Sequence, residues 1–310
     1  MIIQGMTAPL DGVAALPHLG VIRAEGEEAA KFLHGQLTQD FSLLGLGEAR
    51  LAAFCTPKGR MLASFIGFKR SATEIWLVCS RDVLPATLKR LSMFVMRAKL
   101  KLSDASADVA LYGLAGTAQA AFAGDKAAPW AKHEAGAASI VQLYPADGTP
   151  RALWAAPVAE PAPSGLNLSP ELWAWSEVRS GVATVTQPIV EAFVPQMLNY
   201  ESVGGVNFKK GCYPGQEVVA RSQFRGTLKR RAYLVHSAAA LAAGQEVFHE
   251  SDKEQPAGLV AQAAPAPGGG FDAIVSMQVS APQGGALSAG SADGARLELL
   301  PLPYFLLEDI

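Results

Sequence analysis

Short strand-like segments fill the last quarter of the sequence and constrain the fold more than any other feature. From about Leu228 to the C-terminus, apolar runs alternate with Gly- and Pro-rich turns; the runs are AYLVH, QEVFHE, AGLVAQ, AIVSMQV and ARLELLPL. Such spacing is typical of a small all-β barrel or sandwich. The sequence therefore predicts a β-domain at this end of the chain.

The part before residue 145 alternates helix and strand patterns. Residues 25–37 carry the apolar spacing of an amphipathic helix, and residues 50–68 read as a hairpin about the turn TPKG. EIWLVCS predicts a strand, after which Ser80 is a candidate cap for a helix whose buried stripe is Leu84, Leu88, Leu91 and Val95. DVALYGLAG and SIVQLY predict two more strands, with a short Ala-rich helix between them.

Prolines mark a boundary in the middle of the chain. Six of them fall between Pro145 and Pro170, and this density predicts a long connection between subdomains. Ser169 as N-cap, Pro170 at the first helical position and Gly181 just past the end then delimit a helix. The paired tryptophans Trp173 and Trp175 on this helix are interpreted as packing residues.

Composition excludes several classes of protein. The chain has 310 residues, of which 17% are charged, and it shows neither a signal peptide nor a predicted membrane-spanning helix. Its three cysteines lie far apart, which is not the spacing of a disulfide framework or a closed zinc site. Phosphate-binding and dinucleotide-binding glycine motifs are also missing. We expect a cytoplasmic protein with reduced thiols and core positions for Cys55 and Cys79.

One stretch concentrates positive charge in a chain of net charge −2. The basic segment, residues 207–231, reads NFKKGCYPGQEVVARSQFRGTLKRR. Its seven basic residues against Glu217 give a local charge of +6, so the remainder carries −8. An ordinary solvated face mixes both signs, and a single solvated strand start would account for Arg230 or Arg231 alone. The run indicates recognition of an anion, such as a polyglutamate tail, a nucleotide or RNA.

Cys212 lies inside this segment, between Gly211 and Gly215. Adjacent cations favour the thiolate, and the glycines allow a ligand to approach the backbone, so a reactive or metal-ligating sulfur is one interpretation. The other is a small residue packed in a turn, and the cysteine alone does not separate the two. A nucleophilic pair with His236, which lies on a predicted barrel strand, is disfavoured.

The segment KGCYPGQEVVARSQFRGTLKRR resembles the signature of YgfZ-type folate-binding proteins, bacterial relatives of a mitochondrial factor for iron–sulfur cluster assembly. EEAAKFLHGQLTQD, FCTPKGRMLASF and PQMLNYESVGGVNFKKG extend the resemblance over nearly the whole chain. The wider family includes the aminomethyltransferase, or T-protein, of the glycine cleavage system. The resemblance implies an α+β fold with two interleaved subdomains (residues 1–227) in a ring closed by a C-terminal β-barrel (residues 228–310).

The sequence departs from the T-protein pattern where that enzyme has acids. Leu62 and Ala63 occupy the two acidic positions after the turn, and Pro188 replaces a Glu expected to anchor the pterin. Methylene transfer requires an acid to manage a proton on tetrahydrofolate. Whether this chain is an enzyme is therefore left open.

The resemblance implies a protein that binds tetrahydrofolate or a derivative, including polyglutamylated forms. Such a protein supports the assembly or repair of iron–sulfur clusters, including those of tRNA-modifying enzymes. Iron–sulfur enzymes are the expected partners, with tRNA as a further candidate and no membrane. The alternatives are a true aminomethyltransferase and a non-catalytic tRNA-binding module.

We expect Cys212 to carry the chemistry. The residues expected to bind the cofactor are Gln196, Asn199, Lys209, Lys210, Gly211, Tyr213, Gly215, Gln216, Glu217, Arg221 and Arg225.

Overall fold

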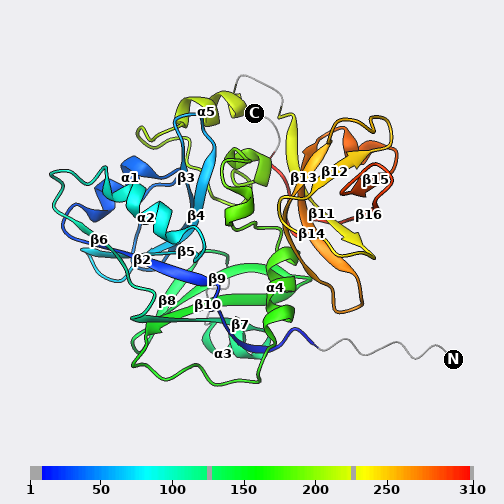
Figure 1. Cartoon of the computed structure of the whole chain (residues 1–310). Helices are drawn as coiled ribbons and strands as arrows, with labels where there is room; N and C mark the ends of the chain where they lie inside the picture. Colours follow the sequence, from blue (N-terminus) through cyan, green and yellow to red (C-terminus); the bar gives the residue numbers. More distant parts are fainter. Residues whose placement is uncertain (1–8, 124–127, 225–227, 308–310) are drawn as a thin grey trace.

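Two antiparallel five-stranded sheets and a closed six-stranded barrel make up the fold (Figure 1). The structure is a computed structural model, and it describes residues 9–123, 128–224 and 228–307. The first sheet has the order β1-β7-β10-β9-β8 and the second the order β3-β4-β5-β2-β6. Because β1 belongs to the first sheet, β2 to β6 to the second and β7 to β10 again to the first, the two subdomains are interleaved.

Many strands of the two sheets are apolar runs buried on both faces, as in β3, β5 and β10. Those of the first sheet are β1 (Gly12–Ala15), β7 (Val109–Ala115), β8 (Lys132–Ala135), β9 (Ala138–Ala146) and β10 (Thr149–Pro157). Those of the second are β2 (Leu19–Glu25), β3 (Ala49–Cys55), β4 (Met61–Lys69), β5 (Glu74–Ser80) and β6 (Lys101–Asp104). The hairpin predicted about TPKG is the β3–β4 pair, and EIWLVCS is β5.

The helices are short and lie outside the sheets or between the sheets and the barrel (Figure 1). They are α1 (Ala29–Gln36), α2 (Leu84–Ser92), α3 (Thr117–Ala123), α4 (Pro170–Arg179) and α5 (Gln216–Phe224), with single 3-10 turns at Gln187–Ile189, Pro195–Leu198 and Ala281–Gln283. None of the helices in the described part of the chain has the length and apolar character needed to cross a membrane.

The barrel closes in the order β11-β14-β13-β12-β15-β16, and all of its strand pairs are antiparallel. Its strands are β11 (Arg230–Ser237), β12 (Glu246–His249), β13 (Gly258–Pro265), β14 (Phe271–Gln278), β15 (Leu287–Ala289) and β16 (Ala295–Leu300). The predicted α+β class with a C-terminal barrel is confirmed. The boundary expected after residue 227 adjoins residues 225–227, which lie outside the described part, and it stays a prediction.

Buried apolar side chains join these parts without a break. One core cluster takes Met61 from β4, Val178 from α4, Tyr200 after the second 3-10 turn, and Leu234 and Ile274 from the barrel. A closed barrel has no free sheet edge, so it can only attach through its outer surface and loops. The cluster therefore fixes the barrel against the two sheets through the segment between α4 and α5.

The sequence predictions of local structure were wrong or incomplete at several places. The proline-rich connection contains β10, because Pro150 and Pro157 lie near the two ends of the strand, where lost ladder bonds cost least. Ser80 does not cap α2; its hydroxyl donates to Asp82, and the helix ends at Ser92, before Val95. The sequence also gave no warning of α5 within the basic segment or of β15, a strand of three residues.

Candidate functional site

A central cavity opens between the two sheets and is closed on one side by α4. The volume that the centre of a water-sized sphere can occupy inside it is about 60 Å³. Apolar and aromatic side chains form most of its wall, which includes Leu51, Phe65, Val78, Trp130, Leu143, Tyr144, Leu153 and Trp173. This lining, mostly apolar with a few polar groups, is typical of a site for a small organic ligand.

Helix α4 points Trp173, Glu177 and Ser180 into the cavity. These residues are four and three positions apart, so they share one helix face. The helix starts as predicted, because the Ser169 side chain accepts a hydrogen bond from the Leu172 N–H and Pro170 follows it. It ends before Gly181, whose φ of 68° is a conformation that glycine adopts without strain. The sequence signals at both ends thus set which side chains face the cavity.

Glu177 places a carboxylate in this largely apolar wall. Its Oε1 lies 3.4 Å from Nε2 of His18, which is half exposed. Burial lowers the pKa of His18 most, but the hydrogen bond and the charge of Glu177 outweigh it and raise the pKa above its ordinary value. The cavity wall therefore has a carboxylate acceptor for N–H groups, and this carboxylate favours the protonated form of the neighbouring His18.

Arg151 on β10 is almost fully buried beside the same wall. Burial lowers its pKa to about 10, and the charge of Glu177 opposes that fall. Its guanidinium lies 4.5 Å from the centre of the Trp173 ring, and its Nη1 donates to the Tyr144 carbonyl at 3.3 Å. Trp173 Nε1 and Arg151 Nε are buried without a hydrogen-bond partner among the described residues. Buried donors normally have partners, so these two favour a ligand that supplies acceptors.

A second cavity lies on the opposite face of α4, between this helix and the barrel. Trp175 and Arg179 line it from the helix, and His236 and Asp272 line it from the barrel. Asp272 accepts a hydrogen bond from Trp175 Nε1 at 2.8 Å and pairs with His236 Nδ1 at 2.8 Å. Its other neighbour is Arg179, 3.6 Å away. This network ties α4 to the barrel.

The Cys212 loop, residues 209–215, lies against the β3–β4 hairpin and the end of α1. Cys212 is exposed, whereas Cys55 and Cys79 are buried, and burial raises the pKa of each buried thiol to about 12. The predicted core positions of these two cysteines are confirmed. Gly215 has a φ of 84°, and a Cβ there would lie 2.5 Å from the Thr56 carbonyl oxygen. Only glycine allows the loop to approach the hairpin this closely.

Lys210, two positions before Cys212, is buried. Its Nζ donates to the carbonyls of Leu37 at 3.0 Å and Gly211 at 3.2 Å, and it lies 4.4 Å from the centre of the Tyr213 ring. Burial is the main reason that the pKa of Lys210 falls to about 8; Asp40 and Cys212 act in the opposite direction. Lys210 therefore holds the Cys212 loop on the C-terminal end of α1.

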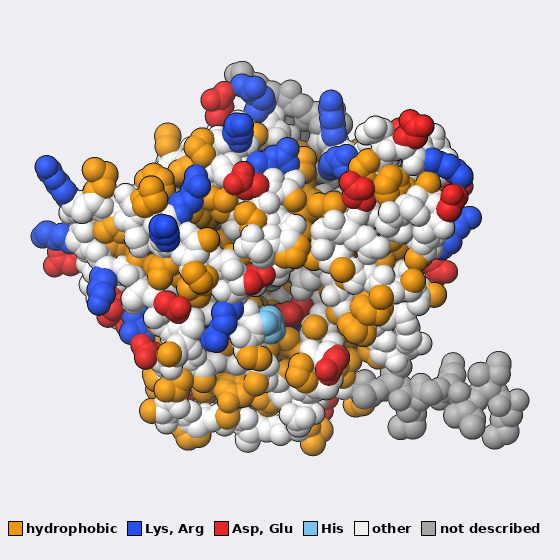
Figure 2. Space-filling view, in the orientation of Figure 1, with side chains coloured by type: hydrophobic (Ala, Val, Ile, Leu, Met, Phe, Trp, Pro, Cys, Tyr) orange, Lys and Arg blue, Asp and Glu red, His pale blue; other side chains and the backbone are white. Residues whose placement is uncertain are grey.

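The charges of the basic segment do not form one surface. Arg221 pairs with Glu217 on exposed α5, and Arg231 forms a buried pair with Glu201, both at 2.7 Å. Arg230 donates to the Ala257 carbonyl, and Lys209 and Lys229 are exposed. Figure 2 shows Lys and Arg side chains along the edge of the molecule where Figure 1 has α5, interspersed with acidic and apolar ones. Arg225 lies outside the described residues.

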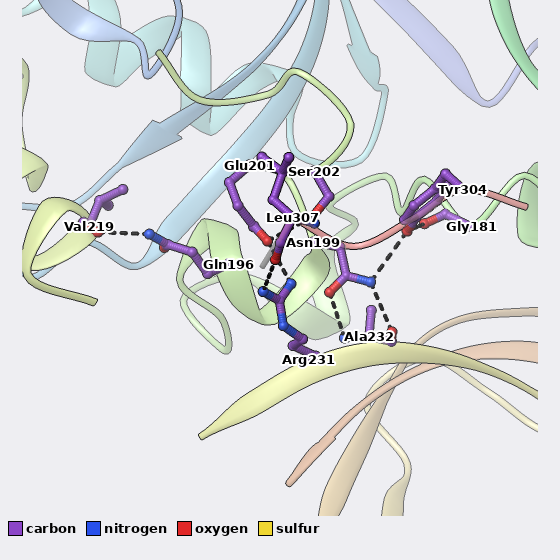
Figure 3. Close-up of polar contacts among 10 residues, drawn as sticks. All are labelled: Gly181, Gln196, Asn199, Glu201, Ser202, Val219, Arg231, Ala232, Tyr304 and Leu307. Atoms are coloured by element: carbon purple, nitrogen blue, oxygen red, sulfur yellow. Dashed lines mark hydrogen bonds and ion pairs between the residues drawn. The ribbon is translucent and has the colours of Figure 1, made fainter. Parts of the chain in front are cut away.

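Two of the predicted binding residues have structural partners (Figure 3). Gln196 Nε2 donates to the Val219 carbonyl of α5 at 2.7 Å. The Asn199 side chain bonds both the N–H and the carbonyl of Ala232 on β11, at 3.1 and 2.8 Å. Both side chains are fully buried. They attach the segment after α4 to α5 on one side and to the barrel on the other.

The predicted residues and the central cavity are thus separate features. None of the residues expected to bind the cofactor that the structure describes lines that cavity. The sequence analysis missed Arg151, Trp173 and Glu177. The helical spacing of Trp173 and Glu177 was the one signal for these two residues, and that spacing is equally typical of core packing.

Leu62 and Ala63 are part of the second sheet's core rather than of the wall. Among the described residues, no cluster of His, Cys, Asp and Glu could hold a metal ion.

Known proteins resemble this chain in sequence and in fold. No protein-family model matches it. Proteins named tRNA-modifying protein YgfZ are similar: that of Cronobacter sakazakii is 28% identical over 91% of this chain and 90% of its own length. That of Klebsiella pneumoniae is 31% identical over 69% of this chain and 68% of its own length.

The solved structure of the glycine cleavage system aminomethyltransferase T from Bartonella henselae has the same fold. It superimposes with a TM-score of 0.71 over 98% of this chain and 88% of its own, at 15% sequence identity. The fold match does not by itself assign a family, but the identity and coverage of the sequence relatives do. The chain belongs to the family of tRNA-modifying proteins named YgfZ.

Proposed function

We propose that this protein binds a reduced folate, tetrahydrofolate or a derivative of it, in the central cavity. We further propose that it thereby supports the assembly or repair of iron–sulfur clusters in the cytoplasm, including clusters of tRNA-modifying enzymes. The proposal of folate binding rests on the wall of the cavity. There the Glu177 carboxylate lies among aromatic rings, together with two buried N–H groups, of Trp173 and Arg151, that have no partner among the described residues. The names of the relatives support a connection with tRNA modification.

The residues of the wall fit a pterin. Its fused ring is flat and apolar on both faces, which suits the aromatic side chains of Trp130, Tyr144 and Trp173. Its edge carries amino and ring N–H donors together with acceptors, which suit Glu177 and the unpartnered N–H groups of Trp173 and Arg151. When bound, a reduced folate supplies a carrier of one-carbon units; the chain's own residues bind and orient it and exclude water.

Cys212 is the residue that we propose to act on the iron–sulfur partner. It is exposed, whereas Cys55 and Cys79 are buried, and the loop that carries it is anchored by the buried Lys210 ammonium. Thiolate sulfur ligates iron and attacks electrophiles, whereas a hydroxyl does neither well. Lys209, Gln216, Glu217 and Arg221 remain proposed contacts at this loop, and Gly211 and Gly215 shape it.

The folate half is tested by calorimetric titration of the full chain with tetrahydrofolate. The wild-type protein should bind, and ligand at about 100 times Kd should add roughly 2.7 kcal/mol to the free energy of unfolding. Glu177→Gln should weaken binding about tenfold or more, because a charged acceptor is lost. The matched control is Glu171→Gln, an exposed acid on the same helix. Absence of both heat and thermal stabilisation in the wild type would remove the proposal.

A transfer assay separates this proposal from the aminomethyltransferase alternative. Wild-type protein is given tetrahydrofolate and an aminomethyl donor, and methylene transfer is followed. The proposal expects folate binding without transfer, because Leu62 and Ala63 are apolar and buried in or against the core. Measurable transfer would establish the alternative. Strongly salt-dependent affinity for tRNA that survives loss of Cys212 would instead favour an RNA-binding module.

A further inference from the structure

A pocket between the start of β4 and the barrel is lined by two arginines that the proposed function does not use. Arg60 precedes β4, and Arg230 is the first residue of β11, so residues 170 positions apart in sequence meet here. The pocket encloses about 640 Å³ with its open mouth included. Phe193, Met197 and Leu259 form its apolar wall, and Glu246 is an exposed acid at its edge.

Each guanidinium is fixed by a single backbone carbonyl. Arg60 Nη1 donates to Ala192 at 2.7 Å, and Arg230 Nη1 donates to Ala257 at 2.9 Å. Both arginines are partly buried. A guanidinium has five N–H donors, so one bond to a neutral carbonyl orients the group and leaves it most of its donors and its full charge.

Arg60 and Arg230 differ in their charge balance from the arginines that form ion pairs. Arg50, Arg70, Arg179 and Arg221 each form an ion pair with Glu or Asp. In the part of the chain that the structure describes, neither Arg60 nor Arg230 has a carboxylate within ion-pair distance. The pocket thus collects two positive charges against the single negative charge of Glu246.

We propose that the Arg60–Arg230 pocket binds an oxyanion, a phosphate or a carboxylate group, whose apolar neighbour packs on Phe193 and Leu259. Two oriented guanidinium groups offer the paired N–H donors that such oxygens accept, and an apolar wall excludes water from them. The exposed Glu246 limits the net charge and so disfavours binding of any polyanion by charge alone. The site is independent of folate binding in the central cavity, whose wall shares no residue with it.

The test is titration of the full chain, without folate and at constant ionic strength, with two probes: inorganic pyrophosphate and tri-γ-glutamate. At least one should bind saturably. Arg230→Gln should weaken that binding about tenfold or more. Arg230→Lys should weaken it less, because lysine keeps the positive charge but lacks the paired N–H donors of the guanidinium. Glu246→Gln should tighten it about two- to fivefold, as expected for removing one exposed like charge. Lys253→Gln, an exposed cation elsewhere on the barrel, is the matched control and should change nothing.

Arg60→Gln is the second variant, and urea unfolding shows whether it still folds after losing its bond to Ala192. If it folds, it should weaken the same probe. Binding of pyrophosphate alone identifies a phosphate group as the natural occupant, and binding of tri-γ-glutamate identifies a carboxylate. The proposal is overturned if neither probe binds saturably, or if both arginine variants bind as the wild type does. Because no folate is present, either failure leaves the proposed function untouched.

Discussion

Arg231 Nη1 donates to Glu201 Oε1 across 2.7 Å in a buried pair that joins β11 to the segment before the Cys212 loop (Figure 3). The Glu201 side chain has no exposed surface, and its Oε2 has no hydrogen-bond partner among the residues that the structure describes. Arg231 also donates to the Leu307 carbonyl near the C-terminus. A charge of the basic segment thus stabilises the junction of three chain segments rather than a ligand.

Removing this cation should destabilise the fold strongly. Arg231→Met leaves the Glu201 carboxylate buried without its partner, which is expected to lower the free energy of unfolding by about 3 kcal/mol. The measurement is urea unfolding at pH 7. Arg221→Met breaks an exposed pair of the same 2.7 Å length with Glu217 and should cost less than about 1 kcal/mol. Equal losses for the two variants would contradict the structural role of the buried pair.

Gly215→Ala should displace the Cys212 loop. The new methyl group would meet the Thr56 carbonyl at 2.5 Å and would have to adopt a φ of 84°. A cost of about 1–3 kcal/mol in unfolding free energy is expected from the backbone conformation alone. Gly35→Ala is the control: nothing lies within 4 Å of its Cβ, and alanine in helix α1 should stabilise by about 0.5–1 kcal/mol. If both variants were equally stable, the close approach of loop and hairpin would not be needed.

The His18–Glu177 contact predicts a pH dependence. Because the pKa of His18 is raised in the folded state, protonated His18 stabilises the fold below its unfolded pKa, about 6.5. This contribution is lost as the pH rises through the higher folded pKa. Unfolding free energies measured from pH 5.5 to 8.5 should contain this decrease, and His18→Gln should remove it. His249→Gln, on the barrel, should retain it; a parallel loss in both variants would refute the assignment.

Cys212→Ser should fold normally and fail in function, whereas Cys79→Ala should retain function with some loss of stability. Serine keeps the size of the exposed side chain but removes a soft ligand and a good nucleophile. Cys79 is part of the second sheet's core, where truncation costs packing. The assay is complementation of a deletion strain, scored by the methylthio modification of tRNA that needs an iron–sulfur enzyme. Restoration by Cys212→Ser at the wild-type level would show that the thiol has no such role.

Local signals in the sequence were enough to predict many of the helices and strands, but not which side chains these elements bring together around the central cavity. Ser169, Pro170 and Gly181 define α4, because capping and φ preferences act within a few residues. Arg151 and Glu177 lie 26 positions apart and meet only because β10 and α4 border the same cavity, which no local pattern encodes. The run of basic residues predicted an anion-binding segment, but its Arg231 is buried against Glu201, a partner that only the tertiary fold brings close.

Helix α4 separates two cavities by the thickness of one helix, about 10 Å. Trp173 and Glu177 face one side, and Trp175 and Arg179, offset by two residues and therefore by about 200° of rotation, face the other. Any twist of the helix that moved Glu177 would also move Arg179 against Asp272. If the proposed folate binds in the central cavity, we expect its binding to be linked to the seating of the barrel. A folate that tightened α4 would then slow exchange of barrel amides with solvent, and a weakened barrel contact would weaken folate binding.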